Sequence, residues 1–249
     1  MPFINLSGYE VFYEKQGEGE HVLLMLPGSL GATRQEYAKQ FEYFEPLSDK
    51  FTLVSWDAPG WGQSRPPERD YNDCYNRDAK LLIELMVDHL KIEKFNLLGF
   101  SDGSRTAIQI ASSYPERVNK LVLLGATTFN SPKELKVFDL CRDVNGWSNE
   151  RRGMFESLYG KDLQMLWAAW VDENRKLDDF MTPELSKITC QVLLLYGEND
   201  IIAPIDPHAP HMRKNLSRSR IHIFPKSSHQ AHQDRTREFN KIVEKFIST

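Results

Sequence analysis

Short runs of apolar residues recur along the chain and alternate with longer segments of mixed character. The runs fall at residues 9–13, 22–26, 51–56, 95–99, 121–124, 192–196 and 221–224. Apolar runs of this length are typical of strands buried within a sheet. The first two runs are separated by Gly17-Glu18-Gly19-Glu20, and this turn-forming sequence predicts a β-hairpin.

Three of the intervening segments, residues 78–90, 106–114 and 236–247, carry apolar residues three or four positions apart. This spacing predicts amphipathic helices. Strands that alternate with helices form mostly parallel sheets with helices on both faces. The pattern therefore predicts an α/β fold with a mostly parallel central sheet flanked by helices.

Residues 128–186 interrupt this alternation. They contain no strand-like run, but they carry helical patches rich in Trp, Leu and Met. A segment of this length is too long for a loop in a compact domain. We therefore expect a helical lid at 128–186, inserted into a core formed by residues 1–127 and 187–249.

Composition narrows the class of protein. The chain has 249 residues, of which 41% are apolar and 27% charged, as in an ordinary globular domain. Its net charge is −4, from 31 basic and 35 acidic residues, so no basic excess indicates a nucleic acid or anionic membrane partner. No run of about 18 apolar residues predicts a membrane span.

The cysteines and the N-terminal sequence indicate the cellular compartment of the protein. Three cysteines, Cys74, Cys141 and Cys190, are too few for a disulfide framework, which indicates a reducing compartment. None has a Cys or His partner at zinc-binding spacing, so we expect no metal. The first residues show neither a secretory signal nor a presequence. We expect a cytoplasmic protein, or a mitochondrial one if a presequence has been removed.

The sequence Gly99-Phe100-Ser101-Asp102-Gly103 lies between an apolar run and a predicted helix. A serine on so tight a strand-to-helix turn has a strained backbone, and glycine on either side avoids collisions. The helix N-terminus offers N–H groups to a developing negative charge. This context predicts Ser101 as the nucleophile of a serine hydrolase with the α/β-hydrolase fold. The alternative is an ordinary glycine-flanked turn.

A serine nucleophile needs a base, which in this fold follows the last strand. Five of the seven histidines come too early or lie inside predicted elements: His21, His89, His208, His211 and His222. His229, in the loop after the last apolar run, is the predicted base, with His232 as the alternative. The open loop at the carboxyl end of a strand is where α/β sheets build their sites.

The acid that orients the base is expected after the preceding strand. Asp200 is the predicted acid, with Glu198 and Asp206 as poorer candidates and a turn-forming Asn-Asp as the alternative interpretation. The oxyanion hole needs two N–H donors. The backbone of Asp102 is expected to supply one, and that of Ser29, in the loop after the second run, the other.

The negative charge of Asp102 indicates what charge the substrate carries near its reacting carbonyl. A carboxylate about 6 Å from a forming oxyanion repels it by about 3 kcal/mol at an effective dielectric of about 20. A substrate with an ammonium group beside its carbonyl would offset that repulsion, as an α-amino acyl group does. The alternative is a carboxylate that merely complements the helix dipole, worth about 0.3–1 kcal/mol.

Several segments resemble the valacyclovirase family, also called the biphenyl hydrolase-like family. They are residues 99–103, residues 56–67 (Trp-Asp-Ala-Pro-Gly-Trp-Gly-Gln-Ser-Arg-Pro-Pro) and Tyr196-Gly197-Glu198-Asn199-Asp200. Within 128–186 the resemblance continues through Arg142-Asp143-Val144, Trp147-Ser148, Leu158-Tyr159-Gly160 and Trp170-Val171-Asp172. It covers nearly the whole chain, and it places nucleophile, acid and base on Ser101, Asp200 and His229.

The resemblance implies a hydrolase of α-amino acid esters, including nucleoside-analogue prodrugs of the valyl-ester type. It also implies that Asp102 binds the substrate's α-amino group. The chain departs from the family at Pro59, where relatives usually carry arginine, and at Ser104 and Arg105 after the nucleophile motif. These departures bear on acyl and alcohol preference rather than on the triad.

The expected reaction passes through an acyl-enzyme and needs no cofactor. A small-molecule ester is the expected partner of a monomeric protein. Trp167 and Trp170 have two interpretations, as lining of the substrate pocket and as packing within the lid. Three alternative functions remain on this fold: a carbon–carbon bond hydrolase, an aminopeptidase and a non-catalytic small-molecule receptor.

Overall fold

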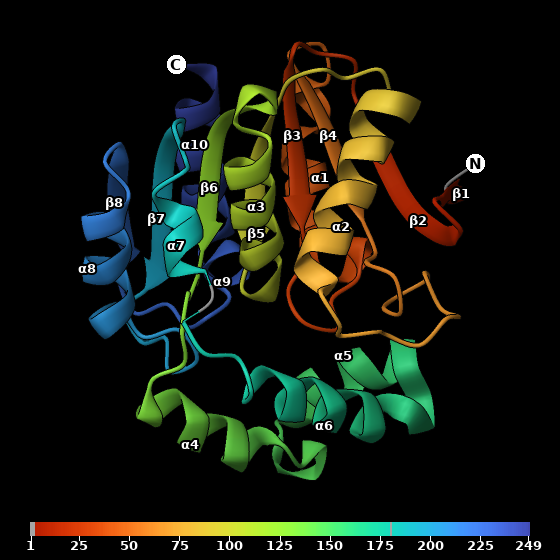
Figure 1. The fold of residues 1–249 in the computed structure, drawn as a ribbon, viewed down its shortest axis with the longest axis vertical. Coiled ribbons are helices and arrows are strands. Elements are labelled where there is room, and N and C mark those ends of the chain that lie inside the picture. Colours follow the sequence, from red (N-terminus) through yellow and green to blue (C-terminus); the bar gives the residue numbers. More distant parts are fainter. Residues whose placement is uncertain (1–2, 180) are drawn as a thin grey trace.

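A central sheet organises the protein (Figure 1). The computed structural model describes residues 3–179 and 181–249, and within these residues eight strands pair in the order β1-β2-β4-β3-β5-β6-β7-β8. β2 is antiparallel to β1 and β4, and every later pair is parallel. The strands are β1 Phe3–Leu6, β2 Tyr9–Gln16, β3 His21–Leu26, β4 Phe51–Trp56, β5 Phe95–Phe100, β6 Val118–Leu124, β7 Gln191–Gly197 and β8 Ser219–Phe224.

Helices cover both faces of the sheet, so its strands are buried on both sides (Figure 1). On one face, Tyr37 of α1 and Phe239 of α10 belong to an apolar cluster with Met25. On the other, Ile108 of α3 and Leu24 belong to a second cluster, which also includes residues of α2 and α8. The helices are α1 Thr33–Phe44, α2 Cys74–Ile83, α3 Asp102–Ser113, α4 Pro132–Cys141, α5 Asn149–Tyr159, α6 Leu163–Asn174, α7 Thr182–Leu185, α8 Ile205–Asn215, α9 Ala231–Asp234 and α10 Thr236–Ser248.

The predicted hairpin between residues 9–13 and 22–26 is wrong. β4 lies between β2 and β3, and the antiparallel hairpin at the sheet edge joins β1 to β2 instead. The glycine-rich turn is bonded to the segment before β4: the N–H of Glu18 donates to the carbonyl of Ser48 at 2.9 Å. The apolar β3 thus has a parallel neighbour on each side, which a hairpin with β2 would have prevented.

The predicted helices are present, but two begin earlier than the apolar spacing indicated. The helix expected at 78–90 begins at Cys74 and continues after Ile83 as a π-helical segment, Glu84–His89. The helix expected at 106–114 begins at Asp102, directly after the nucleophile turn. In both cases the first turn contributes too few apolar residues for periodicity to reveal it.

The chain between β6 and β7 is helical. Figure 1 shows α4, α5 and α6 grouped beyond the carboxyl ends of the parallel strands, whereas α7 contacts α3 and α8 beside the sheet. One of the contacts between this group and the core is a hydroxyl that bonds twice: Tyr159 of α5 donates to the carbonyl of Leu30 at 2.8 Å and accepts from the N–H of Gly62 at 2.7 Å. Among the described residues, no helix is long and apolar enough to cross a bilayer.

Candidate active site

Ser101 lies at the turn between β5 and α3. Its backbone has φ 51° and ψ −120°, a conformation that non-glycine residues rarely adopt. The flanking glycines let this turn pack closely. A Cβ on Gly99 would lie 2.6 Å from the Cα of Ser104, and a Cβ on Gly103 would lie 2.3 Å from the carbonyl oxygen of Pro27. The backbone strain and the crowding expected from the motif are both present here.

The side chains of Ser101, His229 and Asp200 form one hydrogen-bonded series. Nε2 of His229 lies 2.9 Å from Oγ of Ser101, and Nδ1 lies 2.7 Å from Oδ2 of Asp200. A carboxylate only accepts hydrogen bonds, so we assign the ring proton to Nδ1, and Nε2 then accepts from the serine hydroxyl. The structure thus brings together three side chains carried by the loops after β5, β7 and β8.

The carboxylate of Asp200 is fixed on both of its oxygens. Oδ2 contacts His229, while Oδ1 accepts from the N–H groups of Ile202 and Ala203, both at 2.8 Å. The other two acids considered for this role lie elsewhere. Glu198 is exposed and accepts from a backbone N–H in the loop after β8, and Asp206 is exposed on α8. Asp200 is therefore the loop acid that contacts the imidazole.

Two residues that sequence analysis did not identify position the imidazole of His229. Oδ2 of Asp234 accepts from both the N–H and the hydroxyl of Ser228, at 2.8 and 2.6 Å, and so holds the loop just before His229. Gly125 follows β6, and a Cβ there would lie 2.8 Å from Cε1 of the His229 ring. A glycine directly after an apolar run was the available signal for a close approach.

His232, the alternative base, has a different partner. Its side chain is fully buried, and Nε2 lies 2.8 Å from Oε1 of Glu36 on α1. The carboxamide of Gln233 donates to the same carboxylate oxygen at 3.2 Å. The structure therefore pairs His232 with a carboxylate and leaves His229 in contact with Ser101.

The two expected oxyanion donors lie beside Ser101. Ser29 lines the same cavity as Ser101, and Asp102 is the first residue of α3. Within residues 3–179 and 181–249, neither the N–H of Ser29 nor that of Asp102 donates to another protein group. Two N–H groups left without protein acceptors beside a nucleophile can bind an anionic oxygen.

The carboxylate of Asp102 is buried and already paired. Its Oδ1 accepts from the hydroxyl of Tyr75 at 2.8 Å and from the guanidinium of Arg105 at 3.1 Å. Burial and then the Asp102 carboxylate raise the pKa of Tyr75 well above its usual value, so its hydroxyl keeps its proton and donates. Arg105 also donates to Asn174 of α6 at 2.6 Å and to Thr127 at 3.3 Å.

This ion pair changes the electrostatic picture at the nucleophile. The repulsion of about 3 kcal/mol between Asp102 and an oxyanion assumed an unpaired carboxylate. The Arg105 guanidinium offsets that charge, so neutral substrates are penalised less than the sequence indicated. A substrate ammonium would share Asp102 with Arg105. The spacing of three residues between Asp102 and Arg105 at the start of a helix was the available signal for this pair, and sequence analysis did not use it.

Two cavities meet at the reacting groups. A cavity of about 240 Å³ is lined by Ser101 and His229 and by the indole rings of Trp167 and Trp170. A much smaller one, of about 20 Å³, lies between Ser101, His229 and the Asp102–Arg105 pair. The two indoles also stack on each other with ring centroids 4.8 Å apart. They therefore both line the cavity and pack within the helical segment.

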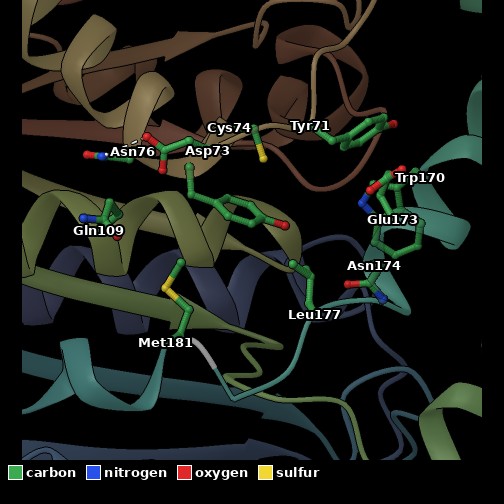
Figure 2. Close-up of a pocket in the computed structure, with 11 residues that line it drawn as sticks. Tyr71, Asp73, Cys74, Asn76, Gln109, Trp170, Glu173, Asn174, Leu177 and Met181 are labelled. Atoms are coloured by element: carbon green, nitrogen blue, oxygen red, sulfur yellow. Dashed lines mark hydrogen bonds between the residues drawn. The ribbon is translucent and has the colours of Figure 1, made fainter.

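A third cavity, of about 270 Å³, lies on the other side of the Asp102–Arg105 network. Figure 2 shows its lining, with Tyr71 and Cys74 from the segment around the start of α2 facing Trp170 and Glu173 from α6. Asn174, which accepts from Arg105, lies at its edge. Two residues of the network, Tyr75 and Asn174, thus line this cavity, whereas Asp102 and Arg105 line the small cavity beside Ser101.

Asp57 orders two loops near the site, and the sequence analysis did not single it out for this role. It is fully buried, and its two oxygens accept from the N–H groups of Thr33 and Gln63 at 2.7 and 2.8 Å. Burial raises the pKa of Asp57, and these two hydrogen bonds oppose that effect. Asp57 thus ties the loop after β4 to the start of α1, next to the loop that carries Ser29.

Comparison with known proteins gives matches along the whole chain. Residues 21–169 match the α/β hydrolase fold family. Serine hydrolase BPHL of Homo sapiens is 36% identical over 98% of this chain and 85% of its own length, and the Mus musculus protein is 35% identical over the same shares. A 2-hydroxy-6-oxononadienedioate/2-hydroxy-6-oxononatrienedioate hydrolase of Pseudomonas putida is 27% identical, over 96% of this chain and 92% of that protein.

The fold is shared with solved structures. An esterase from Exiguobacterium antarcticum superimposes with a TM-score of 0.81 at 21% identity, covering 99% of each chain. At this identity the likeness establishes the fold alone. The family match and the BPHL relatives together show that the chain belongs to the α/β hydrolase family, as a serine hydrolase of the BPHL-like, or valacyclovirase-like, group.

Proposed function

We propose that the protein cleaves α-amino acid esters through an acyl-enzyme, with Ser101, His229 and Asp200 as its catalytic triad. The observation that carries this proposal is the unbroken series from hydroxyl to imidazole to buried carboxylate, with contacts of 2.9 and 2.7 Å. A serine becomes a useful nucleophile when a base accepts its proton and a third group orients that base.

The chemistry follows from the positions of these groups. His229 accepts the proton of Ser101 as Oγ attacks the ester carbonyl, and Asp200 stabilises the imidazolium that forms. The N–H groups of Ser29 and Asp102 bind the oxyanion of the tetrahedral intermediate. The imidazolium then protonates the leaving alcohol, and a water molecule activated by His229 releases the amino acid. No step calls for a metal or an organic cofactor.

Asp102 is the proposed contact for the substrate's ammonium group. Its carboxylate lines the small cavity beside Ser101 and His229, on the side where an acyl group would extend. Tyr75 and Arg105 both donate to Oδ1, and an ammonium would bind the same carboxylate beside them. Because Arg105 competes for the same carboxylate, we expect a moderate preference for amines rather than an absolute requirement.

Residues 128–186 are the proposed lid, with α4, α5 and α6 as the part that covers the site. Phe138, Trp167 and Trp170 from these helices line the cavity that contains Ser101. Covering helices exclude water and shape the space for the alcohol portion of a substrate. We propose a monomer that acts on small-molecule esters.

A second candidate, a carbon–carbon bond hydrolase, is favoured by one observation. Arg105 offsets the charge of Asp102, so the site repels an anionic vinylogous substrate less strongly than a lone carboxylate would. Relatives named as hydrolases of 2-hydroxy-6-oxo dienoates are 25–27% identical to this chain. The two candidates share a triad and differ in the charge of the substrate beside its reacting carbonyl.

The decisive experiment compares two esters of the same alcohol, one of valine and one of 3-methylbutanoate, which differ only in the amino group. We expect kcat/KM to favour the valine ester by about tenfold or more, since one charge-assisted hydrogen bond is worth about 1.5–3 kcal/mol. Asp102→Asn should lower this ratio, and the control Asp73→Asn should not. Equal rates for both esters in the wild-type enzyme would refute amine recognition.

A covalent label tests the nucleophile independently of substrate. A fluorophosphonate should modify Ser101, and the label should be lost in Ser101→Ala and greatly slowed in His229→Ala. Peptide mapping by mass spectrometry locates the adduct. Modification of another serine in the wild-type enzyme would overturn the assignment of Ser101.

A further inference from the structure

Arg151 of α5 lines the cavity that contains Ser101 and His229. Its guanidinium carbon lies 4.2 Å from the ring centre of Trp147 and 5.2 Å from that of Trp167. Contacts of this kind attract a cation to an aromatic face and hold a long side chain in one orientation. The α5 helix therefore presents an ordered positive charge to the substrate cavity.

This guanidinium has no carboxylate partner in the described part of the chain. Within residues 3–179 and 181–249 it forms no ion pair at 4.0 Å or less, and Glu36 is the carboxylate whose charge reaches it from a longer distance. The buried arginines Arg69 and Arg105, in contrast, contact Asp78 and Asp102 at 2.6 and 3.1 Å. Burial lowers the pKa of Arg151, yet an arginine remains protonated in proteins.

Glu36 is the acidic residue that shares this cavity with Arg151. Its Oε1 accepts from His232 at 2.8 Å and from Gln233 at 3.2 Å, so this oxygen is already bonded within the fold. Burial lowers the pKa of Arg151, and the Glu36 charge opposes this effect without an ion-pair contact. Arg151 is thus a charged group that faces the substrate space and whose hydrogen-bond donors are unused by the fold. Because a charge that loses its water needs a partner, a cation whose donors face a substrate cavity can bind an anion there.

We propose that Arg151 recognises a carboxylate on the alcohol portion of the substrate. This inference rests on the proposed ester hydrolysis. If the acyl group lies on the side of Asp102, the alcohol would occupy the larger cavity, whose lining includes Ser29 and Arg151. The planar fork of donors on a guanidinium matches a carboxylate through two parallel hydrogen bonds. The substrate would then carry an ammonium at its acyl end and a carboxylate at its alcohol end.

The test uses two isosteric substrates, the valine esters of 4-(hydroxymethyl)benzoate and of 4-(hydroxymethyl)benzamide. They differ in one anionic group and share the scissile bond. For the wild-type enzyme we expect kcat/KM to be about tenfold to a hundredfold higher for the benzoate. The difference should shrink as salt is raised from low ionic strength, because part of it is electrostatic. A third substrate with a phosphate in place of the carboxylate shows whether any anion suffices.

Arg151→Gln should bring the benzoate-to-benzamide ratio close to one, because the loss should fall mainly on the benzoate ester. Arg151→Lys keeps the positive charge but lacks the planar pair of N–H donors, so it should give a benzoate-to-benzamide ratio between those of the wild type and Arg151→Gln. Arg152→Gln is the matched control. Arg152 lies next in the chain, but its guanidinium donates to Glu156 and Asn145 at the surface, so the ratio should be unchanged.

Two outcomes would overturn the proposal. One is equal turnover of the two esters by the wild-type enzyme. The other is a loss in Arg151→Gln that is the same for both esters, which would indicate that the side chain only supports Trp147 and Trp167.

A binding assay separates this inference from the proposed amino acid esterase activity. Free 4-(hydroxymethyl)benzoate should slow fluorophosphonate labelling of Ser101 in the wild-type enzyme more than the benzamide does. The effect should disappear in Arg151→Gln. This result would support anion recognition even if no valine ester is a substrate. Equal protection by the two alcohols would refute it, whatever the esters show.

Discussion

The charged groups at the carboxyl ends of the strands and the Arg151 cation that faces them from α5 differ in whether the fold supplies a partner, although other charged side chains of the same helices are paired. On the sheet side, Asp200 is buried with both oxygens occupied, and His229 contacts a partner through each ring nitrogen. On the helix side, Arg151 points a cation into the cavity with no carboxylate partner among the described residues. Partners fixed by the fold orient groups for chemistry, whereas unused donors remain available to a substrate.

This difference in pairing predicts different roles for the loops at the ends of the strands and for the helices that face them. Substitutions on the sheet side should lower turnover of every substrate, because they act on the reacting atoms themselves. Substitutions on the helix side should change which substrate is preferred, or how firmly the helices are held. The following predictions test that division, beginning with the largest effect.

Asp200→Asn should lower kcat by about 10³- to 10⁴-fold for all esters, because an amide at this position favours the wrong imidazole tautomer. Steady-state kinetics with two alcohols should give the same factor for each. Glu198→Gln, in the same loop, is the control and should stay within about twofold. A loss confined to one alcohol would break the proposed division between the two regions.

Tyr159→Phe removes the hydroxyl that joins α5 to the loops after β3 and β4. The carbonyl of Leu30 and the N–H of Gly62 would each lose a hydrogen bond of 2.8 or 2.7 Å, so we expect destabilisation by about 1–3 kcal/mol. Urea unfolding measures it, with Tyr114→Phe as the control. Unchanged stability would mean that the helices are held to the core by apolar packing instead.

Asp234→Asn should have the smallest effect and a characteristic pH dependence. Partial burial raises the pKa of Asp234, but hydrogen bonds from Ser228 and Ser227 outweigh it and leave the pKa below the ordinary value of 3.8. A lowered carboxyl pKa stabilises the folded state above pH 3.8, and this stability is lost as the pH falls through the folded pKa. Because the side chain is exposed, we expect less than about 1 kcal/mol.

Unfolding of the wild type and of Asp234→Asn at pH 7, 5 and 3 checks this expectation. The difference between them should be similar at pH 7 and 5 and smaller at pH 3. A difference that grows as the pH falls would show that Asp234 is not held in its ionised form by the loop that carries His229.

Much of the site followed from local chemistry and chain order. Ser101 was identified because glycines flank a serine between an apolar run and a helix. His229 followed because it alone occupies an open loop directly after the last apolar run. The strain at Ser101, with φ 51°, is a local property that the motif already encodes. Such predictions can be made from sequence because neighbouring residues set both the turn and its exposure.

Hydrogen bonds and ion pairs between side chains on distant segments could not be inferred from local sequence. The sequence did not show that His232 is paired with Glu36 of α1 or that Arg105 shares Asp102 with Tyr75 of α2. It also led to an incorrect hairpin, since a turn signal says nothing about a strand that inserts from later in the chain.

The sequence by itself determined the alternation of strands and helices, the tight turn at Ser101 and the positions of Asp200 and His229 in loops that follow apolar runs. It could do so because backbone propensity, apolar spacing and turn chemistry act over a few residues. Only the tertiary structure decided which charges are neutralised and which remain open to a ligand. Electrostatic pairing depends on distances of a few ångströms between side chains that may be a hundred residues apart, and folding alone sets those distances.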